Sequence, residues 1–253
     1  MKLSVCIDAV FAGKNRAESL RALNAAGIGA FEFWSWWDKD TAELKRTAQE
    51  LGLTVAAFCT KMVSLADPAR REEYLRGLEE SVGVAQYLGC RSLITQVGGD
   101  TGCSRESQRR SIVEGLRASA GLLEPAGVTL LVEPLNTKVD HPGYYLSSSL
   151  EGFDIIGEVG SPNVKLLFDL YHQQITEGNL TSNIVRNIGK IGHFHAAGVP
   201  GRHEPGSGEL NYRYLFERID RAGFQGFMGL EYFPAGDPAE GLRALVRTMP
   251  GAS

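Results

Sequence analysis

The sequence predicts an α/β fold, a single (β/α)8 TIM barrel spanning residues 1–253 as one domain, and three observations indicate it. Short runs of apolar and β-branched residues alternate with longer amphipathic stretches, as in repeated βα units. Glycine recurs just before a predicted strand, where a helix can end in a left-handed turn. The alternation repeats eight times without a long linker, which favours a closed barrel over an open doubly wound sheet.

The eight predicted strands are the apolar runs of the chain, and each leads into a loop and then a helical stretch. In chain order the strands are Leu3–Asp8, Ala30–Trp34, Thr54–Cys59, Ser92–Val97, Thr129–Glu133, Val164–Asp169, Ile191–His195 and Phe227–Tyr232. The helices that follow them are Arg16–Ala26, Thr41–Leu51, Arg70–Leu88, Arg105–Glu124, Leu150–Val159, Leu180–Asn187, Tyr212–Ala222 and Pro238–Val246. The glycines expected to close these helices are Gly27, Gly52, Gly89, Gly127, Gly160 and Gly223.

Composition and charge argue against several classes of protein. A formal net charge of -4 and a pI near 5.8 provide no general attraction to phosphate backbones or anionic membranes, so we expect neither as a partner. No apolar run approaches the length of a membrane span, and Asp8 interrupts the first apolar run, which argues against a signal peptide. We expect a cytoplasmic protein with reduced thiols, because no Cys-x-x-Cys pair occurs among Cys6, Cys59, Cys90 and Cys103.

Ionisable side chains lie at the ends of the last four predicted strands. Glu133, Asp169 and His195 close strands five, six and seven, and Glu231 lies next to the end of strand eight. In a closed barrel the active site lies at the carboxyl ends of the strands, so these four side chains should converge on one cavity. His193 lies two residues before His195, and the strand period of two places both imidazoles on one face. We expect His193 to be a hydrogen-bonded core residue or a support for a ligand.

Three carboxylates and one imidazole form an oxygen-rich donor set. Such a set suits manganese, magnesium or cobalt better than a thiolate-seeking metal. The ion could polarise a substrate carbonyl and its neighbouring hydroxyl while an enediolate develops negative charge. Glu133 and Glu231, on opposite sides, could then move a proton between adjacent carbons. Each residue alone could equally cap a helix or pair with a surface arginine, but four on successive strands favour catalysis.

Three motifs resemble a known family through nearly the whole chain. They are Glu133-Pro134-Leu135-Asn136 with Asp140-His141-Pro142-Gly143-Tyr144, then Phe168-Asp169-Leu170-Tyr171-His172, and the segment 201–212, GRHEPGSGELNY. With these motifs the sequence resembles the hydroxypyruvate isomerase family, within the xylose-isomerase-like barrels that also include ketose 3-epimerases.

This resemblance implies a reaction and roles for particular residues. It implies that Glu133 and Glu231 are the acid/base pair and ligate a divalent ion together with Asp169 and His195. His172 and Arg202 match family positions that hold substrate oxygens. The implied reaction interconverts hydroxypyruvate and tartronate semialdehyde, a small-molecule substrate class in carbohydrate metabolism.

Two positions depart from the isomerase or the epimerase pattern. Several hydroxypyruvate isomerases carry glutamine where this chain has His195, and the epimerases carry histidine there. The epimerases place a second glutamate where this chain has Val139. His195 thus favours the epimerases and Val139 favours the isomerases, and a ketose 3-epimerase acting on a free sugar is the nearest alternative. A metal-dependent phosphodiesterase or abasic-site nuclease would need more histidine ligands and a basic face, and the intact quartet argues against a non-catalytic sugar-binding subunit.

Two further segments invite a functional and a structural interpretation. Arg202 lies in a Gly/Pro-rich loop, where it could bind a carboxylate or hydroxyl, or be a solvated arginine on a flexible connector. Trp34, Trp36 and Trp37 follow strand two closely, and we expect at least one to line the pocket and others to be core. Exposed aromatics would alternatively indicate a homo-oligomer interface.

Overall fold

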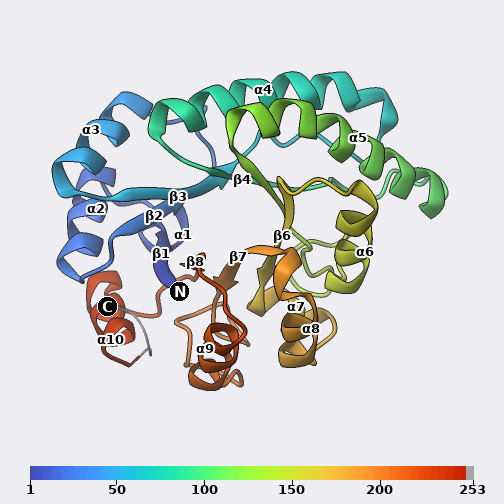
Figure 1. Cartoon of the computed structure of the whole chain (residues 1–253). Coiled ribbons are helices and arrows are strands. Elements are labelled where there is room, and N and C mark those ends of the chain that lie inside the picture. The colour runs from blue at the N-terminus through green and yellow to red at the C-terminus, as the bar shows by residue number, and fades with distance from the viewer. Residues whose placement is uncertain (249–253) are drawn as a thin grey trace.

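The computed structural model describes residues 1–248 and contains eight parallel strands that close into a barrel in the order β1 to β8 (Figure 1). The strands are β1 Lys2–Cys6, β2 Ala30–Phe33, β3 Thr54–Cys59, β4 Ser92–Thr95, β5 Thr129–Val132, β6 Val164–Asp169, β7 Ile191–Ala196 and β8 Phe227–Leu230. The predicted fold class is confirmed, since β8 pairs with β1 and leaves no open sheet edge among these strands.

Helices surround the barrel on its outer side (Figure 1). They are α1 Ile7–Val10, α2 Arg16–Ala25, α3 Thr41–Leu51, α4 Arg71–Leu88, α5 Arg105–Ala126, α6 Ser149–Val159, α7 Leu170–Thr176, α8 Leu180–Asn187, α9 Tyr212–Arg221 and α10 Pro238–Thr248, with short 3-10 turns η1 Pro68–Arg70 and η2 Ile188–Lys190. Within residues 1–248, no helix combines the length and apolar character that crossing a membrane requires.

The predicted bounds differ from the observed ones mainly at the carboxyl ends of the strands. Five strands end one or two residues earlier than predicted, because the chain turns away from the sheet as it enters the site. Helices α1 and α7 were not predicted. The residues of α1 follow β1 directly and are apolar except for Asp8, and so short an apolar segment does not reveal where a strand gives way to a helix. Helix α7 begins directly after β6, where the Asp169 carboxylate accepts the backbone N–H groups of Tyr171 and His172.

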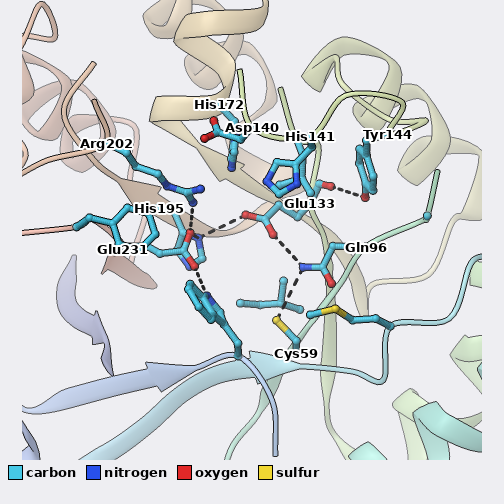
Figure 2. A pocket seen from close by; sticks show the side chains of 16 residues that line it. Cys59, Gln96, Glu133, Asp140, His141, Tyr144, His172, His195, Arg202 and Glu231 are labelled. Atoms are coloured by element: carbon cyan, nitrogen blue, oxygen red, sulfur yellow. Dashed lines mark hydrogen bonds and ion pairs between the residues drawn. The ribbon is translucent and has the colours of Figure 1, made fainter. Parts of the chain in front are cut away.

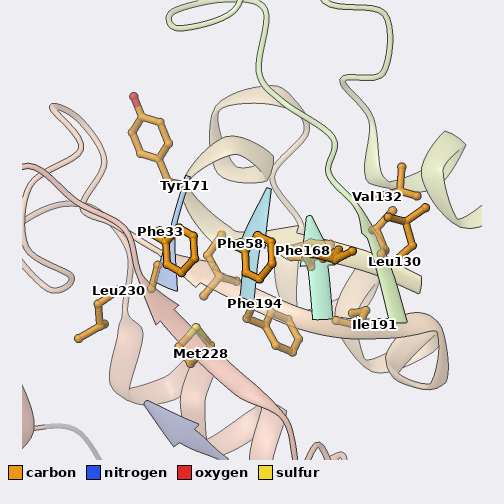
Figure 3. Close-up of a cluster of buried hydrophobic side chains, with 14 of the residues drawn as sticks. Phe33, Phe58, Leu130, Val132, Phe168, Tyr171, Ile191, Phe194, Met228 and Leu230 are labelled. Carbon is orange, nitrogen blue, oxygen red and sulfur yellow. The ribbon is translucent and has the colours of Figure 1, made fainter. Parts of the chain in front are cut away.

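Successive side chains of each strand face opposite sides, which divides the apolar core into two clusters. The larger cluster lies between strands and helices and includes Phe33, Phe58, Phe168 and Phe194 (Figure 3). Phe33 and Phe58 are register partners on β2 and β3, and their rings stack 4.9 Å apart. The smaller cluster lies inside the barrel and comprises Ala57, Cys59, Ile94, Leu131 and Leu167, with Trp34 packed against it. Residues that continue this inward alternation reach the rim.

The loops at the two ends of the barrel differ in length. Helices α3, α4, α5 and α6 each end at a glycine in the left-handed conformation, as predicted, and the chain enters the next strand within a few residues. Gly89, with φ of 70°, is typical: only two residues separate it from β4. The loops that follow β2, β3, β4, β5 and β7 are longer, and they surround the carboxyl ends of the strands, where the candidate site lies.

Candidate active site

A cavity of about 590 Å³ opens at the carboxyl ends of the strands. Five of the predicted site residues line it, namely Glu133, His172, His195, Arg202 and Glu231 (Figure 2). Its apolar walls include Trp34, Met62, Ile94, Leu135 and Phe233. A pocket with largely apolar walls and a few convergent polar groups is the usual form of a small-molecule site.

The four predicted ligands come together at the floor of this cavity. Glu133, Asp169, His195 and Glu231 are all buried, and each offers one ligand atom within 4.8 Å of the others. Their inward direction follows from the strand period of two. Glu133 and Asp169 each lie two residues beyond a member of the inner cluster, Leu131 and Leu167. The alternation that packs the barrel interior therefore also directs these side chains to one point.

Glu231 is held by two donors from different loops. The Trp34 indole Nε1 donates to its Oε1 at 2.6 Å, and Arg202 Nη2 donates to its Oε2 at 2.5 Å. Burial raises the pKa of this carboxyl, but the positive charges of His195 and Arg202 outweigh burial and hold the pKa well below its usual range. Glu231 is therefore an anion in the folded protein.

Glu133 and Glu231 follow different strands, β5 and β8, and both approach His195 (Figure 2). Gln96 Nε2 donates to Glu133 Oε2 at 3.1 Å and so fixes one carboxylate oxygen. The other oxygen, Oε1, lies 3.5 Å from His195 Nδ1, and Glu231 Oε2 lies 3.4 Å from the same nitrogen. The two carboxylates thus meet at one imidazole nitrogen, a spacing that allows both to contact one small substrate.

The His195 ring presents its two nitrogens to different surroundings. Nε2 hydrogen-bonds Glu32 Oε2 at 2.9 Å, whereas Nδ1 is buried and has no hydrogen-bond partner among residues 1–248. Burial lowers the pKa of His195, but the carboxylates of Glu231 and Glu32 outweigh burial and raise the pKa well above its ordinary value. A buried nitrogen surrounded by carboxylate oxygens is the electrostatic environment expected for a cation site.

Asp169 has a separate role for each of its oxygens. Oδ1 accepts the N–H groups of Tyr171, at 2.7 Å, and His172, at 3.2 Å, which caps α7. Oδ2 lies 3.5 Å from His172 Nε2 and 3.7 Å from Arg202 Nη2, two residues that line the cavity, although Asp169 itself does not line it. Burial raises the pKa of Asp169, and Arg202 opposes that increase.

His172 is fixed in one tautomer by Asn136. The Asn136 amide Nδ2 donates to His172 Nδ1 at 2.7 Å, and the backbone N–H of Asn136 approaches the same atom at 3.3 Å. Since Nδ1 is an acceptor, the ring proton is on Nε2. Burial and the neighbouring Arg202 charge lower the pKa of His172 to about 3, so the ring is neutral. Its Nε2–H makes no hydrogen bond within residues 1–248, although Asp169 Oδ2 lies 3.5 Å away.

The loop that carries Arg202 is folded on itself. The Arg202 N–H donates to the Gly198 carbonyl at 2.9 Å, and the Arg202 carbonyl accepts the Phe233 N–H at 2.8 Å. The side chain is 13% exposed, and its guanidinium lies 5.1 Å from the centre of the Tyr171 ring. The structure therefore shows a tethered, largely buried arginine in place of a solvated one.

The three tryptophans have different environments. Trp34 lines the cavity, as expected of at least one of them. Trp36 packs against the outer apolar cluster and donates from Nε1 to Ser81 Oγ at 3.1 Å. Trp37 is 44% exposed. Val139 is also exposed and does not line the cavity, whereas the next two residues of its loop, Asp140 and His141, do.

Sequence reasoning missed the residues that hold the site in place. Glu32 contacts His195, Gln96 contacts Glu133, and Asn136 contacts His172. The sequence contained a signal for Glu32 and Gln96. Glu32 lies two residues before Trp34, and Gln96 lies two residues after Ile94, so both share the inward side of their strands. A carboxylate inside a run of alanine and phenylalanine needs a buried partner.

Comparisons with known proteins show which family the chain resembles in sequence and fold. Residues 20–250 match the model of the family described as the xylose isomerase-like TIM barrel. Hydroxypyruvate isomerase of Escherichia coli (strain K12) is 38% identical over 177 residues, covering 70% of this chain and 68% of that protein. The 2-oxo-tetronate isomerase of Cupriavidus necator is 36% identical over 230 residues, covering 87% of this chain and 88% of that protein. A crystal structure from Brucella melitensis, described as AP endonuclease, family 2, has a TM-score of 0.93 at 33% identity, covering 98% of both chains.

Proposed function

The chain belongs to the hydroxypyruvate isomerase family of the xylose isomerase-like TIM barrels and is an isomerase, and on this premise we propose that it interconverts a small ketose or 2-keto hydroxy acid with its aldehyde isomer. Hydroxypyruvate and tartronate semialdehyde are the proposed pair, with a 2-oxo-tetronate as a longer substrate. The observation that supports this reaction is that Glu133 and Glu231, which come from different strands, both lie within 3.5 Å of one nitrogen of His195 at the floor of one cavity.

The residues at this floor fit a divalent cation. Carboxylates outnumber cationic groups there, since Glu32, Glu133, Asp169 and Glu231 are all buried around His195 and Arg202. His195 Nδ1 offers a buried lone pair beside them once the ring is neutral. We propose that Glu133, Asp169, His195 and Glu231 hold a manganese, magnesium or cobalt ion. When bound, such an ion would polarise the substrate carbonyl and the neighbouring hydroxyl.

The two glutamates then account for the proton transfer. One carboxylate removes the proton from the hydroxyl-bearing carbon next to the carbonyl, which leaves an enediolate. The other group starts as the neutral acid and gives its proton to the former carbonyl carbon, while the hydroxyl proton passes between the two oxygens. Proton exchange with water between turnovers restores both groups. Because the reaction is reversible, each glutamate is the base in one direction and the acid in the other. Gln96, Trp34 and Arg202 keep the two carboxylates in place while protons move.

Other residues of the cavity bind the substrate and exclude water. The Nε2–H of His172 and the guanidinium of Arg202 donate hydrogen bonds to substrate oxygens. Trp34, Leu135 and Phe233 provide apolar walls, which keep water from the enediolate. The volume of about 590 Å³ lies within the roughly 300–1,000 Å³ typical of small-molecule sites, so a sugar of several carbons also fits.

One rival function has a specific observation in its favour. The Brucella structure described as an AP endonuclease shares this fold at 33% identity. A nuclease of this kind would bind a polyanion, yet the chain has a net charge of -4 and the proposed ligand set contains three carboxylates and one imidazole. Epimerisation at the third carbon of a free sugar would use the same glutamates, so it remains an alternative outcome of the assay.

Proton NMR in deuterated water separates these reactions. The protein is incubated with magnesium, then with manganese or cobalt, and with hydroxypyruvate, a 2-oxo-tetronate, erythrulose, fructose or tagatose. Solvent deuterium should enter hydroxypyruvate or the tetronate with formation of the aldehyde isomer. Formation of a 3-epimer would show that the protein is an epimerase and would overturn the proposed isomerase reaction. Cleavage of an abasic-site duplex without exchange into any carbonyl compound would establish the nuclease, and binding without turnover an accessory subunit.

Arg202→Lys is expected to weaken substrate binding and turnover while the barrel stays folded. Lysine keeps the charge but loses the planar guanidinium, whose Nη2 lies 2.5 Å from Glu231 Oε2 and 3.7 Å from Asp169 Oδ2. Loss of a hydrogen bond to a charged group costs about 1.5–3 kcal/mol, so kcat/KM should fall roughly 10- to 100-fold. Steady-state kinetics with the substrate identified by NMR would measure it.

Arg105→Lys is the matched control, because Arg105 also stacks on a tyrosine, Tyr145, and pairs with a glutamate, Glu151, but does not line the cavity. Normal KM and kcat in Arg202→Lys would remove Arg202 from the substrate site.

A further inference from the structure

A second cluster of ionisable side chains lies inside the barrel, beneath the proposed metal ligands. Glu32 on β2 is 1% exposed, and its two oxygens contact two different rings of β7. Oε1 lies 3.0 Å from His193 Nε2, and Oε2 lies 2.9 Å from His195 Nε2. Ser4 Oγ on β1 also donates to Oε1. One carboxylate therefore joins side chains of three strands at the centre of the barrel.

The geometry of this cluster is that of hydrogen bonds and not of a second metal site. Glu32, His193 and His195 offer ligand atoms within 4.8 Å of one another. However, each imidazole contacts its own carboxylate oxygen at close to 3 Å, whereas a metal bound to nitrogen and oxygen would lie about 2.0–2.2 Å from each. An ion between the three residues would have to break both hydrogen bonds. Glu32 is better explained by what it does to the rings.

The carboxylate determines which nitrogen of His195 is free. An ionised carboxylate only accepts hydrogen bonds, so His195 must donate from Nε2. In the neutral ring the proton is then on Nε2, and the lone pair is on Nδ1. This is the nitrogen that lies 3.5 Å from Glu133 Oε1 and 3.4 Å from Glu231 Oε2. A metal ligand must be deprotonated at the coordinating atom, so Glu32 favours the one tautomer of His195 that can bind at the cavity floor.

A glycine on β8 makes room for this arrangement. Gly229 is the register partner of His195 on one side and of Ser4 on the other. A Cβ atom at Gly229 would lie 2.5 Å from Glu32 Oε1 and 2.6 Å from His195 Cδ2, both too close for real contacts. Because β8 contributes no side chain here, those of β1, β2 and β7 can meet. The backbone is therefore shaped around the contact between Glu32 and His195.

We propose that Glu32 is a positioning residue for the metal centre, which orients His195 and fixes its tautomer, with His193 and Ser4 holding the carboxylate and Gly229 providing the space. This inference rests on the metal centre of the proposed function. A carboxylate on the outer N–H of a ligating histidine also increases the basicity of the ligand, and loss of such a partner typically costs about 10- to 100-fold in metal affinity or activity.

Glu32→Gln tests the proposal on the full-length protein. The amide NH₂ group would face one ring N–H, donor against donor, so one imidazole would have to change its tautomer. Equilibrium dialysis with manganese should show a roughly 10- to 100-fold weaker affinity. The visible absorption of the cobalt-loaded protein should also shift, since it reports the geometry of the ligands. Gly229→Ala should change affinity and spectrum in the same direction, because the added methyl group displaces Glu32 and His195.

Tyr74→Phe is the matched control. It removes a buried hydroxyl, hydrogen-bonded to Thr95 Oγ1 at 3.0 Å, on the outer side of β4, so it should affect stability without changing metal affinity or the cobalt spectrum. If Glu32→Gln does not fold, Ser4→Ala and Gly229→Ala provide the comparison. A folded Glu32→Gln with the wild-type affinity and spectrum would overturn the positioning role.

Failure of the proposed function has a different signature. A wild-type protein that binds none of the three metals would overturn the metal centre and the positioning role with it. Weakened metal binding in Glu32→Gln, in a protein that turns over none of the carbonyl substrates, would support the positioning role and overturn the proposed reaction. If the wild-type protein turns over a carbonyl substrate and its Glu32→Gln variant binds metal normally, the proposed reaction would be supported and the positioning role overturned.

Discussion

Glu133→Gln and Glu231→Gln should each lower kcat by about 10²- to 10⁴-fold, the usual contribution of a general acid or base. Glutamine has nearly the same shape as glutamate but cannot take a proton from carbon at neutral pH. Gln96 can still donate to the Oε1 of a glutamine at 133, so the side chain should keep its place. Exchange of substrate hydrogen with deuterated water, measured by proton NMR at saturating metal, detects the loss directly.

Metal occupancy must be measured on the same samples, because both glutamates are also proposed ligands. A variant that keeps its metal and its fold but loses exchange has lost a base. Glu158→Gln is a suitable control, since Glu158 is paired with Arg109 on the outside of the barrel. Near-normal exchange in Glu133→Gln or Glu231→Gln would remove that residue from the mechanism.

Asp169→Asn should weaken metal binding by roughly 100-fold or more. Loss of a residue that only hydrogen-bonds a metal ligand already lowers metal affinity by about 10- to 100-fold, and Asp169 is proposed to bind the metal itself. The substitution separates the two roles of this side chain. An asparagine oxygen still accepts the N–H groups of Tyr171 and His172, so α7 remains capped. The negative charge at the cavity floor is lost, and Arg202 then faces one carboxylate fewer. Calorimetric titration with manganese measures the affinity, and excess metal should restore part of the activity.

Asp169→Ala shows what the cap contributes. It should weaken the metal as Asp169→Asn does and in addition lower stability by about 0.5–2 kcal/mol, the usual cost of losing an N-cap. Denaturant unfolding of the metal-free proteins separates this cost from metal binding. An Asp169→Asn variant with unchanged metal affinity would show that the proposed ligand set is wrong.

The sequence predicted the barrel and the four residues at its floor for one common reason. Strands alternate inward and outward side chains, so an ionisable residue at the end of an apolar strand is directed toward the cavity in a closed barrel. Glu133, Asp169 and His195 follow this rule, and all three are close together in the structure. Closure of the barrel was also necessary, because only a closed barrel brings the ends of β5 and β8 to the floor of the same cavity.

The contacts between side chains could not be predicted in this way. Glu32 and His195 are 163 positions apart and meet only because β2 and β7, which β1 and β8 separate in the barrel wall, both direct side chains into the barrel interior. The space that they use depends on Gly229, and an absent side chain leaves no signal of its own in one sequence. Helix α7 was missed because its start depends on the cap by Asp169, a residue that already had an interpretation as a ligand.

The outward and inward sides of the strands also have different freedom to change. The phenylalanines that pack against the helices, such as Phe58 and Phe168, stabilise the fold and take no part in the reaction. An exchange at an inward position, such as Gln96, alters the chemistry and leaves that packing intact. Ancestors of this chain could thus have acquired new reactions through a handful of inward substitutions, and the same barrel can occur in proteins described as isomerases and as an AP endonuclease. Laboratory evolution toward a new substrate would do best to mutate the inward positions and the loop residues that line the cavity.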